Sequence, residues 1–436
     1  MSERRTGQPG LFEELHWRGL VHQVTDAEAL PRLLDQDRLT GYIGFDPSAD
    51  SLHVGHLQQV FLLRRLQQAG HQAIALIGGG TGMIGDPSFK SDERRLLDVG
   101  TIEANRAAVR AQLSRLVEPA PAAPGTGGVV LADNLDWLAG AGLLEFLRDV
   151  GKAFSVNEMV RKDSVRARLE GREQGLSFTE FSYMLLQAWD FVQLFDRYGC
   201  RLQMGGSDQW GNIIEGVDLI RRMRRAQAFG LTSPLVLKAD GSKFGKTESA
   251  TVWLASERTS PYSFFQFWLR SADSDVGSYL RRFTWLERDR IAELEELTAN
   301  APERREAQRA LATEVTTIVH GADHATAAER AAEVLFTEDV AGLDAATLAS
   351  ALADAPTTEL PGSELSGGVS LVDALVRCGL ASSNGAARRD LAGGGISVNG
   401  RRATVERQLG PDDVLAGGFV IVRKGRANQH VLRIRR

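Results

Sequence analysis

The sequence predicts an α/β fold for residues 1–255, an all-helical segment for 256–336 and a small α+β module for 369–436. Short apolar runs alternate with helical patterns in the first of these segments, which favours a parallel sheet. The middle segment shows helical periodicity only. In the last module a pair of short helical patterns precedes extended runs, and the Asn399-Gly400 pair is a strong signal for a hairpin turn.

The segment 41–56, GYIGFDPSADSLHVGH, combines an apolar run that predicts a buried strand with a helix expected from about Ser51. His53, Gly55 and His56 then lie in the first helical turn. Free backbone N–H groups and the positive end of the helix dipole favour an anion at such a place. The alternatives are an exposed, solvated histidine pair and, with less support, a metal-binding pair.

A second apolar run at 72–77 predicts another buried strand, which leads into GGGTGMIGD. The glycine spacing at 80–85 formally matches the GxGxxG dinucleotide fingerprint. The match fails in context, because Asp86 and a proline follow where a helix should continue, and no second strand ends in an acid at the required distance. Asp86 is expected either to bind a substrate cation or to cap the turn.

A strongly apolar helix is expected over 177–198, after a charged helix, a Pro/Gly-rich connection and a third strand near 128–131. A capping box at Ser177 marks its start. Polar side chains at i, i+4 and i+7 share one face of this helix: Tyr183, Gln187 and Asp190. Polar groups on a largely buried helix must be satisfied, and a ligand and an internal hydrogen-bond network both remain open.

A strand at 201–204 leads into the loop GGSDQWGN and then into a helix expected over 213–229. Asp208 in this loop is expected either to cap the helix or to accept hydrogen bonds from a ligand, for instance from ribose hydroxyls. The helix also carries a basic run, which is usually only a solvated face. Its members are Arg221, Arg222, Arg224 and Arg225.

The segment 241–247, GSKFGKT, is one residue short of a Walker phosphate loop, and no helical pattern follows it. It places Lys243 and Lys246 on a Gly-containing loop. One interpretation is a loop that closes over phosphates, with the ammonium groups neutralising charge. The other is a solvated basic turn, which this segment taken alone favours. A short strand near 251–254 is expected to end the α/β region.

The charge distribution sets the last module apart. The chain of 436 residues has a net charge of −5, yet 369–436 holds 12 Lys and Arg against 5 Asp and Glu, which is +7. The preceding segment, 337–368, is acidic and rich in Ala, Pro and Gly, and predicts a linker with some helix. A basic module on an acidic body indicates an anionic partner for that module.

The two cysteines, Cys200 and Cys378, are too few and too far apart for a disulfide framework or a zinc site. No cluster of metal-ligating residues is evident, so no tightly bound metal is expected. The sequence shows neither a signal peptide nor an uncharged apolar run of membrane-spanning length. We therefore expect a cytoplasmic, soluble protein with no membrane partner.

Taken together, the motifs resemble those of the bacterial-type tyrosyl-tRNA synthetases, a class I family. The matching segments are GFDPSADSLHVGHL, ALIGGGTGMIGDPSFK, SFTEFSYMLLQAWD, GGSDQWGN and KADGSKFGKT. HVGH resembles the HIGH signature of that class, and KFGKT resembles this family's form of the KMSKS loop. The basic module, with ISVNG at its centre, resembles a small RNA-binding domain that also occurs in a ribosomal protein and in pseudouridine synthases. The resemblance covers essentially the whole chain.

This resemblance implies ATP-dependent activation of L-tyrosine to tyrosyl-adenylate and transfer of tyrosine to the 3′ end of tRNA(Tyr). It implies a Rossmann-like catalytic domain at 1–255, a helical anticodon-recognition domain at 256–336, an acidic linker at 337–368 and an RNA-binding domain at 369–436. It also implies a homodimer in which one tRNA contacts both subunits. ATP would be a substrate that brings its own Mg²⁺.

The resemblance further assigns roles to residues at the matching positions. The phenol of tyrosine would bond Tyr42 and Asp190, and its ammonium group would be held by Asp86, Tyr183 and Gln187, with Gln209 nearby. The nucleoside of ATP would contact Gly44, Asp46, Gly55, Gly206 and Asp208. The triphosphate would contact Ser48, His53, Lys90, Arg94, Lys243, Lys246 and Thr247, with His56 orienting the loop. The acceptor stem of the tRNA would meet Arg221 and Arg222.

Three positions depart from the family pattern: Ile43 lies where Cys is common, Ser48 where Thr is common, and Trp189 where Tyr is common. Ile43 removes a polar contact to ribose, so the affinity for ATP is expected to differ.

Three alternative functions remain: a tryptophanyl-tRNA synthetase, an RNA-binding or splicing factor on a synthetase scaffold, and a dinucleotide-dependent oxidoreductase. The paired Tyr42 and Asp190 favour a phenol over an indole, and the intact HVGH and KFGKT motifs favour retained catalysis. The failed glycine context disfavours the oxidoreductase.

Overall fold

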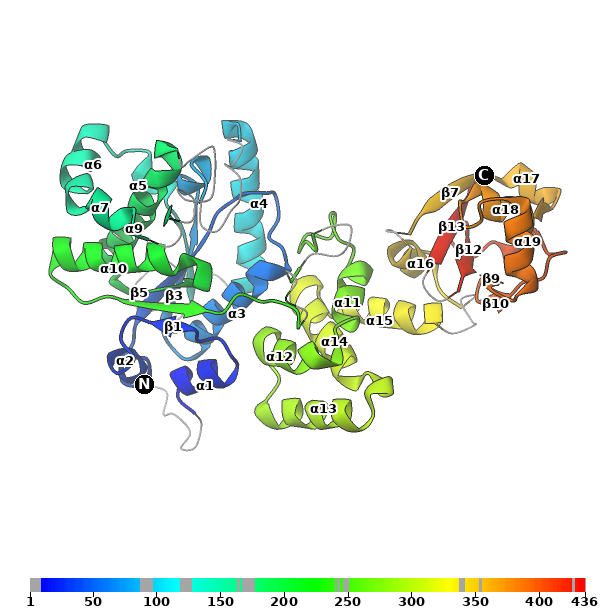
Figure 1. The fold of residues 1–436 in the computed structure, drawn as a ribbon, viewed down its shortest axis with the longest axis horizontal. Helices are drawn as coiled ribbons and strands as arrows, with labels where there is room; N and C mark the ends of the chain where they lie inside the picture. The colour runs from blue at the N-terminus through cyan, green and yellow to red at the C-terminus, as the bar shows by residue number, and fades with distance from the viewer. Residues whose placement is uncertain are drawn as a thin grey trace. The chain divides into compact units, whose positions relative to one another are not determined.

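The computed structural model describes residues 9–86, 97–117, 128–162, 165–166, 177–239, 241, 244–245, 251–336, 342–352, 355–425 and 428–435 (Figure 1). The chain forms two compact units. Unit 1 comprises Met1–Leu254 and Ser274–Glu296, and unit 2 comprises Ala255–Asp273 and Leu297–Arg436.

A six-stranded sheet forms the centre of unit 1, in the order β1-β6-β5-β2-β3-β4. The strands are β1 (Gln23–Val24), β2 (Thr40–Phe45), β3 (Gln72–Ile77), β4 (Val129–Asp133), β5 (Cys200–Gly206) and β6 (Phe229–Ser233). All neighbours pair in parallel except β1, which pairs antiparallel with β6 at the edge. The chain runs from β2 to β3 in one direction along the sheet and from β5 to β6 in the other, so the direction of winding reverses between β2 and β5. In open α/β sheets a ligand crevice forms at such a point, outside the carboxyl ends of the strands.

Helices cover both faces of this sheet (Figure 1). The long ones are α3 (Val54–Gln68) and α4 (Val99–Val117) on one face and α9 (Phe178–Tyr198) and α10 (Trp210–Arg224) on the other. Right-handed crossovers require this division, because the connections of β2–β3–β4 and of β5–β6 run in opposite directions along the sheet. Side chains from α9, α10 and the sheet, among them Tyr42 and Phe191, form one buried core.

Shorter elements complete unit 1. They are α1 (Leu11–Trp17), α2 (Ala29–Gln36), η1 (Thr81–Met83), α5 (Leu135–Leu138), α6 (Leu143–Asp149), η2 (Gly151–Ala153), α7 (Val156–Met159) and η3 (Ser207–Gln209). Most of α12 (Asp273–Phe283) and α13 (Arg288–Asn300) also belongs to this unit. The buried Arg65 of α3 contacts the segment between α12 and α13. Its guanidinium donates to the Thr284 carbonyl at 2.6 Å and lies over the Trp285 ring.

Unit 2 begins with three helices and ends in a smaller sheet. The helices α11 (Pro261–Leu269), α14 (Glu306–His320) and α15 (Ala322–Phe336) pack on one another. The sheet has the order β10-β9-β12-β13-β7, with β7 (Thr357–Pro361), β9 (Ile396–Val398), β10 (Arg401–Arg402), β12 (Phe419–Lys424) and β13 (Asn428–Arg435). The short helices α18 (Leu371–Arg377) and α19 (Asn384–Ala392) share an apolar core with it. Smaller elements are α16 (Ala345–Ala351), η4 (Pro302–Arg304), α17 (Gly362–Ser366), β8 (Val369–Ser370), β11 (Gln408–Leu409) and η5 (Pro411–Asp413).

Many predicted elements are confirmed. The strand expected at 72–77 is β3, and the strongly apolar helix is α9, where the Ser177 hydroxyl accepts from the backbone N–H of Glu180 at 3.2 Å. The helices-only prediction after residue 260 is confirmed for the described residues up to Phe336. The hairpin turn is also confirmed, because Asn399 and Gly400 both have positive φ, 48° and 83°.

Other predictions are wrong in detail. The helix expected over 213–229 ends at Arg224, because Arg225 adopts a left-handed conformation with φ 53°, and Phe229 begins the unpredicted strand β6. Helix α3 begins at Val54 rather than near Ser51. The short strand expected near 251–254 is an isolated bridge between His53 and Trp253. The expected linker contains a strand, β7, which pairs in parallel with β13.

None of the helices in the described part of the chain is long and apolar enough to cross a membrane.

Candidate active site

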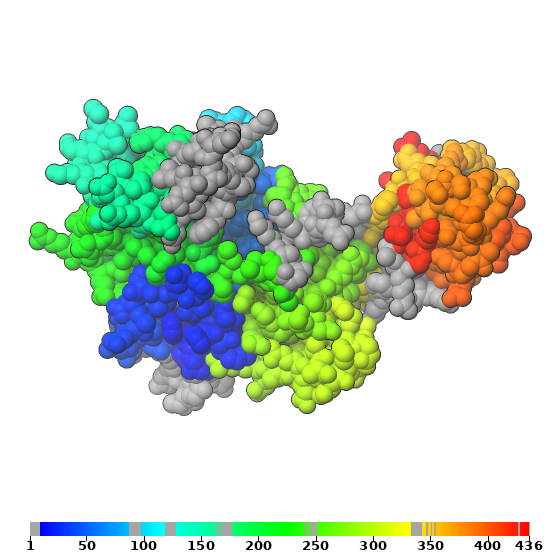
Figure 2. Space-filling model, in the orientation of Figure 1, coloured from blue at the N-terminus to red at the C-terminus, as the bar shows by residue number. Residues whose placement is uncertain are grey.

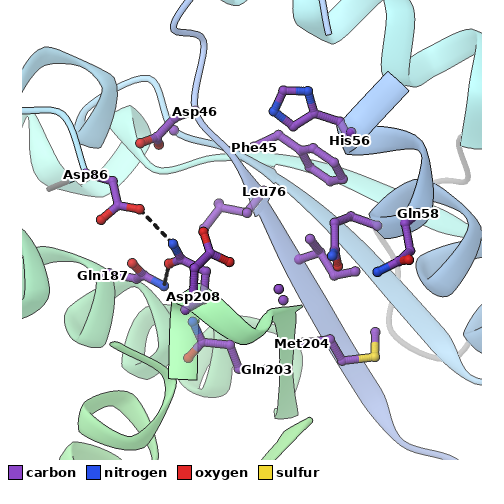
Figure 3. A pocket seen from close by; sticks show the side chains of 18 of the residues that line it. Phe45, Asp46, His56, Gln58, Leu76, Asp86, Gln187, Gln203, Met204 and Asp208 are labelled. Carbon is purple, nitrogen blue, oxygen red and sulfur yellow. Dashed lines mark hydrogen bonds between the residues drawn. The ribbon is translucent and has the colours of Figure 1, made fainter. Parts of the chain in front are cut away.

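A cavity of about 520 Å³ opens at the carboxyl ends of β2 and β5 (Figure 3). The connections that follow these two strands run in opposite directions along the sheet. Its wall includes residues from both strands, from α9, and from the turns after β2, β3 and β5. Figure 3 shows Asp46, Asp86, Gln187 and Asp208 directed toward this space from different elements. The structure therefore brings side chains from separate motifs into one site.

Tyr42 and Asp190 lie in the wall of this cavity, and each is almost completely buried. Burial raises the pKa of the Tyr42 phenol well above its usual value, and the negative charge of Asp190 raises it further. The Tyr42 hydroxyl is buried without a hydrogen-bond partner among the described residues. A buried hydroxyl next to a carboxylate and lacking a partner can hydrogen-bond a polar group of a ligand.

Asn134 and Trp137 hold the Asp190 carboxylate in place. The Asn134 amide donates to Oδ2 at 2.8 Å, and the Trp137 indole N–H donates to Oδ1 at 2.7 Å. Burial raises the pKa of Asp190 to about 8, while the hydrogen bonds from Asn134 and Trp137 lower it. The two donors oppose the shift that burial causes, and each carboxyl oxygen keeps a lone pair that can accept another hydrogen bond from a ligand hydroxyl.

A second polar cluster joins Asp86 to helix α9. Gln209 donates to Asp86 Oδ2 at 2.7 Å, and Gln187 donates to Gln209 Oε1 at 3.3 Å, as the dashed lines in Figure 3 show. Asn212 donates to Gln187 Oε1 at 3.0 Å. One carboxylate surrounded by amides suits a small cation such as an ammonium group. The sequence analysis expected Asp86, Gln187 and Gln209 in one site, and the structure brings them together.

Tyr183 and Asp46 are paired in a way that the sequence analysis did not expect. The Tyr183 hydroxyl donates to Asp46 Oδ2 at 2.9 Å, and the Thr81 hydroxyl donates to Asp46 Oδ1 at 2.9 Å. Burial, and then the charge of Asp46, raise the pKa of Tyr183 well above its usual value. The resemblance placed Asp46 beside the nucleoside, but its carboxylate is hydrogen-bonded to Tyr183, which was expected at the ammonium group.

The two histidines of HVGH form a capping box at the start of α3. His53 is the N-cap, and its Nδ1 accepts from the backbone N–H of Gly55 at 3.1 Å. His56 Nδ1 accepts from the backbone N–H of His53, also at 3.1 Å. The N–H groups of Val54 and His56 donate to the carbonyls of Val252 and His53. The expectation of free backbone N–H groups for an anion is therefore wrong, because side chains and carbonyls already occupy them.

This arrangement fixes where the imidazole protons lie. A neutral imidazole whose Nδ1 accepts a hydrogen bond carries its proton on Nε2. Both rings line the cavity, with their centroids 4.0 Å apart. The helix start can therefore contact an anion through the Nε2–H groups of His53 and His56 rather than through its backbone.

The glycine-rich turn after β3 makes room for side chains of the site. A Cβ at Gly78 would lie 2.0 Å from Asp46 Oδ1, and one at Gly79 would lie 2.3 Å from Asp133 Oδ1. The backbone N–H of Gly80 donates to Asn134 Oδ1 at 2.7 Å. The turn continues into the short 3-10 helix η1 and not into the α-helix that a dinucleotide fingerprint requires.

The remaining residues expected at ATP also line this cavity: Gly44, Ser48, Gly55, Gly206 and Asp208. No described atom lies within 4 Å of the position that a Cβ would take at Gly44, so a flat ligand has room there. At Gly55 a Cβ would lie 2.8 Å from the His53 ring, and at Gly206 it would lie 2.4 Å from Asp208 Oδ1. A side chain at either position would therefore displace the His53 ring or the Asp208 carboxylate.

Five residues expected at the triphosphate lie outside the described residues: Lys90, Arg94, Lys243, Lys246 and Thr247. Within the same KFGKT segment, Phe244 is described. Its ring stacks on Phe283 with centroids 5.4 Å apart, and it also contacts Tyr279. Phe244, the second residue of this segment, therefore packs against helix α12.

The basic run on α10 is largely ion-paired. Arg221 and Arg222 share Asp218, with N–O distances of 2.5 and 2.6 Å, and Arg222 also lies 3.3 Å from Glu158. Arg224 pairs with Asp196 at 2.6 Å. These pairings neutralise much of the charge that the sequence suggested.

Across the described part of the chain, no group of three or more His, Cys, Asp or Glu side chains is arranged to hold a metal ion.

Motif-based reasoning missed several polar residues of the site. They are Thr81, Asn134, Trp137, Gln203 and Asn212. A usable signal existed, because Thr81 and Asn134 follow the carboxyl ends of β3 and β4, where open parallel sheets place ligand-binding residues.

Two family profiles match most of the chain. A family profile described as class I tRNA synthetases (W and Y) matches residues 34–337. A second profile, described as the tyrosine–tRNA ligase SYY-like C-terminal domain, matches residues 347–432.

Two similar proteins match nearly the whole chain, and a solved structure matches about three quarters of it. The tyrosine–tRNA ligase of Roseiflexus castenholzii is 52% identical over 97% of this chain and 99% of its own. That of Geobacillus stearothermophilus is 49% identical over 97% and 99%. The crystal structure of a C-terminally truncated mitochondrial tyrosyl-tRNA synthetase from Aspergillus nidulans has a TM-score of 0.69 and 33% identity, covering 76% of this chain and 95% of that one.

Proposed function

Because the chain belongs to the class I tyrosyl- and tryptophanyl-tRNA synthetases, and within them to the tyrosine–tRNA ligases, we propose that it activates L-tyrosine with ATP and joins it to the 3′ end of tRNA(Tyr). The observation that carries this proposal is the buried pair of Tyr42 and Asp190 in the wall of the cavity. A hydroxyl and a carboxylate at that depth suit the phenol of tyrosine, which can donate one hydrogen bond and accept another.

The amino acid would lie between two polar groups of the cavity. Its phenol would bond Tyr42 and Asp190, and its ammonium group would lie among Asp86, Gln187 and Tyr183, with Gln209 beside them. The hydrogen bond between Tyr183 and Asp46 adds a second carboxylate to the ammonium side. Phenylalanine would leave the buried phenol-binding groups without a partner, and tyrosyl-tRNA synthetases are the standard example of discrimination by this effect.

ATP would occupy the rest of the cavity. The open space at Gly44 suits the nucleoside, with Asp208 near the ribose and Gly55 and Gly206 in the wall. Ser48 and His53 would contact the triphosphate, and Lys90, Arg94, Lys243, Lys246 and Thr247 would join them. Mg²⁺ would enter on the phosphates of ATP, because the described residues offer no carboxylate cage for it.

The first step would be in-line attack of the tyrosine carboxylate on the α-phosphorus of ATP, with pyrophosphate leaving. This carboxylate is already ionised at neutral pH, so no protein base is needed. The protein must instead position the two substrates and stabilise charge on the departing pyrophosphate. The Nε2–H of His53, which the helix cap orients, suits that second task. The tyrosyl group would then pass from the adenylate to the terminal ribose of the tRNA.

Amino-acid-dependent ATP–pyrophosphate exchange with all twenty amino acids tests this proposal. We expect exchange with tyrosine and not with phenylalanine or tryptophan. Exchange with tryptophan would favour the nearest alternative enzyme, and exchange with none would favour an RNA-binding factor without catalysis.

For the basic C-terminal module we propose contact with tRNA phosphates. Four arginines on α19 and on the β9–β10 hairpin are exposed, and no ion pair is recorded for them within the described residues: Arg388, Arg389, Arg401 and Arg402. Exposed arginines without a carboxylate partner suit phosphate groups. Arg221 and Arg222 would meet the acceptor stem, but they would first have to exchange Asp218 and Glu158 for phosphates.

Replacing Arg388 and Arg389 together by alanine is expected to raise the KM for tRNA about tenfold, because two phosphate contacts are lost, and to leave pyrophosphate exchange unchanged. Aminoacylation at varied tRNA and salt concentration measures this effect, and the salt dependence should weaken by about one unit of slope per lost contact. Arg377→Ala with Arg435→Ala is the matched control, since these arginines pair with Glu364 and Glu359. Equal effects of both pairs would contradict the proposed interface.

We also propose that the protein is a homodimer formed through α6, α7 and the start of α9. Of the nine exposed large apolar side chains among the described residues, five lie there: Leu143, Leu144, Leu147, Val156 and Phe178. Leu144 is 81% exposed and Phe178 78% exposed. Figure 2 shows the α6–α7 region, in blue-green, at the surface. Such a concentration of apolar side chains marks an interaction site.

Phe178→Asp is expected to shift the protein from dimer to monomer at micromolar concentration, because a charge would be buried in an apolar interface. Analytical ultracentrifugation measures the shift. Val99→Asp is the control, since Val99 is also exposed and apolar but lies on α4. A monomeric wild-type protein, or equal dissociation by both variants, would disprove the assignment.

We further propose that the protein acts in the cytoplasm, where tRNA, ATP and tyrosine meet. The proposed domains are a catalytic domain at 1–255, an anticodon-recognition domain at 256–336 and an RNA-binding domain at 369–436. The segment 337–368 joins the last two and contributes strand β7 to the sheet of the RNA-binding domain.

A further inference from the structure

Thr81 lies between the two polar groups of the cavity and bonds to members of both. Its hydroxyl donates to Asp46 Oδ1 at 2.9 Å, and Asp46 accepts the Tyr183 hydroxyl on its other oxygen. Thr81 Oγ1 accepts from the Asn134 amide, also at 2.9 Å. The same amide nitrogen donates to Asp190 Oδ2 at 2.8 Å. Tyr183, Asp46, Thr81, Asn134 and Asp190 therefore form one continuous chain of hydrogen bonds.

The donors and acceptors in this chain have fixed directions. The backbone N–H of Gly80 can only donate, and it donates to Asn134 Oδ1 at 2.7 Å, which orients the amide. Both amide protons of Asn134 are then used, one on Asp190 and one on Thr81. Since Thr81 Oγ1 accepts from Asn134, its single proton is directed to Asp46. The chain therefore presents a donor to each carboxylate.

We propose that Thr81 is a positioning residue that couples recognition of the two ends of the amino acid, by holding Asp46 at the ammonium end and, through Asn134, Asp190 at the phenol end. This inference rests on the proposed function for the identity of the substrate. The hydrogen bonds themselves do not depend on that function.

Gly78 leaves room for this chain of hydrogen bonds. A Cβ at Gly78 would lie 2.0 Å from Asp46 Oδ1 and 2.6 Å from Thr81 Oγ1. Any residue other than glycine there would displace the Asp46–Thr81 pair. Thr81 is 2% exposed and Asn134 is fully buried, so water cannot replace either partner without rearrangement.

Thr81→Val keeps the shape of the side chain and removes its hydroxyl. We expect the KM for tyrosine in pyrophosphate exchange to rise about tenfold to hundredfold, as for the loss of a hydrogen bond to a charged group, with the KM for ATP unchanged. Selectivity for tyrosine over phenylalanine should fall about tenfold, because Asn134 no longer holds Asp190 in one orientation. Thr81→Ser restores the hydroxyl and should return both quantities to near wild-type values.

Thr232→Val is the matched control, because Thr232 is fully buried in the same sheet and its hydroxyl has no hydrogen-bond partner in the described part of the chain. It should leave both quantities unchanged. If Thr81→Val aggregates, the smaller Thr81→Ala is expected to give the same changes. Wild-type KM and selectivity in both Thr81 variants would overturn the proposal, as would equal increases in the KM for tyrosine and for ATP. Absence of tyrosine-dependent exchange in the wild-type protein would instead refute the proposed function.

Discussion

Asp190→Asn is expected to lower kcat/KM for tyrosine in pyrophosphate exchange by about 30- to 5,000-fold, which corresponds to about 2–5 kcal/mol for removing one member of a buried, hydrogen-bonded charged group. Asn134 and Trp137 each donate to one oxygen of this carboxylate. An asparagine offers one oxygen and one NH₂ group, so one of the two donors would face another donor. The phenol of tyrosine would also lose one of the two carboxyl oxygens that could accept from it.

The control for this substitution lies on the same helix. Asp196→Asn removes a carboxylate that pairs with Arg224 at the surface of α9, and it is expected to change kcat/KM by less than about fivefold. The KM for ATP should stay unchanged in both variants. Tyrosine-dependent exchange at the wild-type rate in Asp190→Asn would refute the phenol assignment.

His53→Ala is expected to reduce kcat for tyrosyl-adenylate formation by about 10²- to 10³-fold, the usual effect of removing one donor aimed at developing charge. The KM for tyrosine should change little, because the proposed contact of the ring is with the phosphates of ATP and not with the amino acid. Pre-steady-state measurement of adenylate formation separates these two quantities. The variant should also lose about 1 kcal/mol of stability, since His53 is the N-cap of α3.

His53→Asn separates catalysis from capping. Asparagine is a strong N-cap residue and can accept the backbone N–H of Gly55 in place of the ring, but it is too short to present a donor at the position of Nε2. Stability should therefore return while kcat stays low. Recovery of wild-type kcat in His53→Asn would show that the histidine acts only through the helix start.

Elements with strong periodicity could be predicted from the sequence. Helix α9 has an N-cap serine and an apolar periodicity, and β3 is an uninterrupted buried run, so local sequence is enough to predict both. The strands β1 and β6 escaped prediction for a tertiary reason. β1 has only two residues and exists because it pairs with the edge of β6, and β6 follows α10 after a left-handed Arg225 that no composition signal marks.

The residues of the site also divide into those that local sequence predicts and those that only the tertiary structure brings together. Residues inside recognisable motifs, such as Asp190 and Asp86, could be identified because their spacing is informative. Asn134 and Thr81 lie after separate strands, and only the sheet order brings them together with Asp190. The expectation of free N–H groups at the start of α3 was wrong for two reasons. The Val54 N–H donates to the Val252 carbonyl, which is a tertiary contact, and the two histidine rings cap the turn locally.

The parallel pairing of β2 with β5 has a consequence for how the protein is made. It sets Tyr42 opposite Gln203, although β3, α4, β4 and α9 come between them in the chain. Contacts between such distant segments form late in folding, because a long loop must close first. A nascent chain that has not been extended through Gly206 lacks one wall of the pocket. Tyrosine can therefore stabilise this unit by mass action only after β5 has been synthesised and has paired with β2.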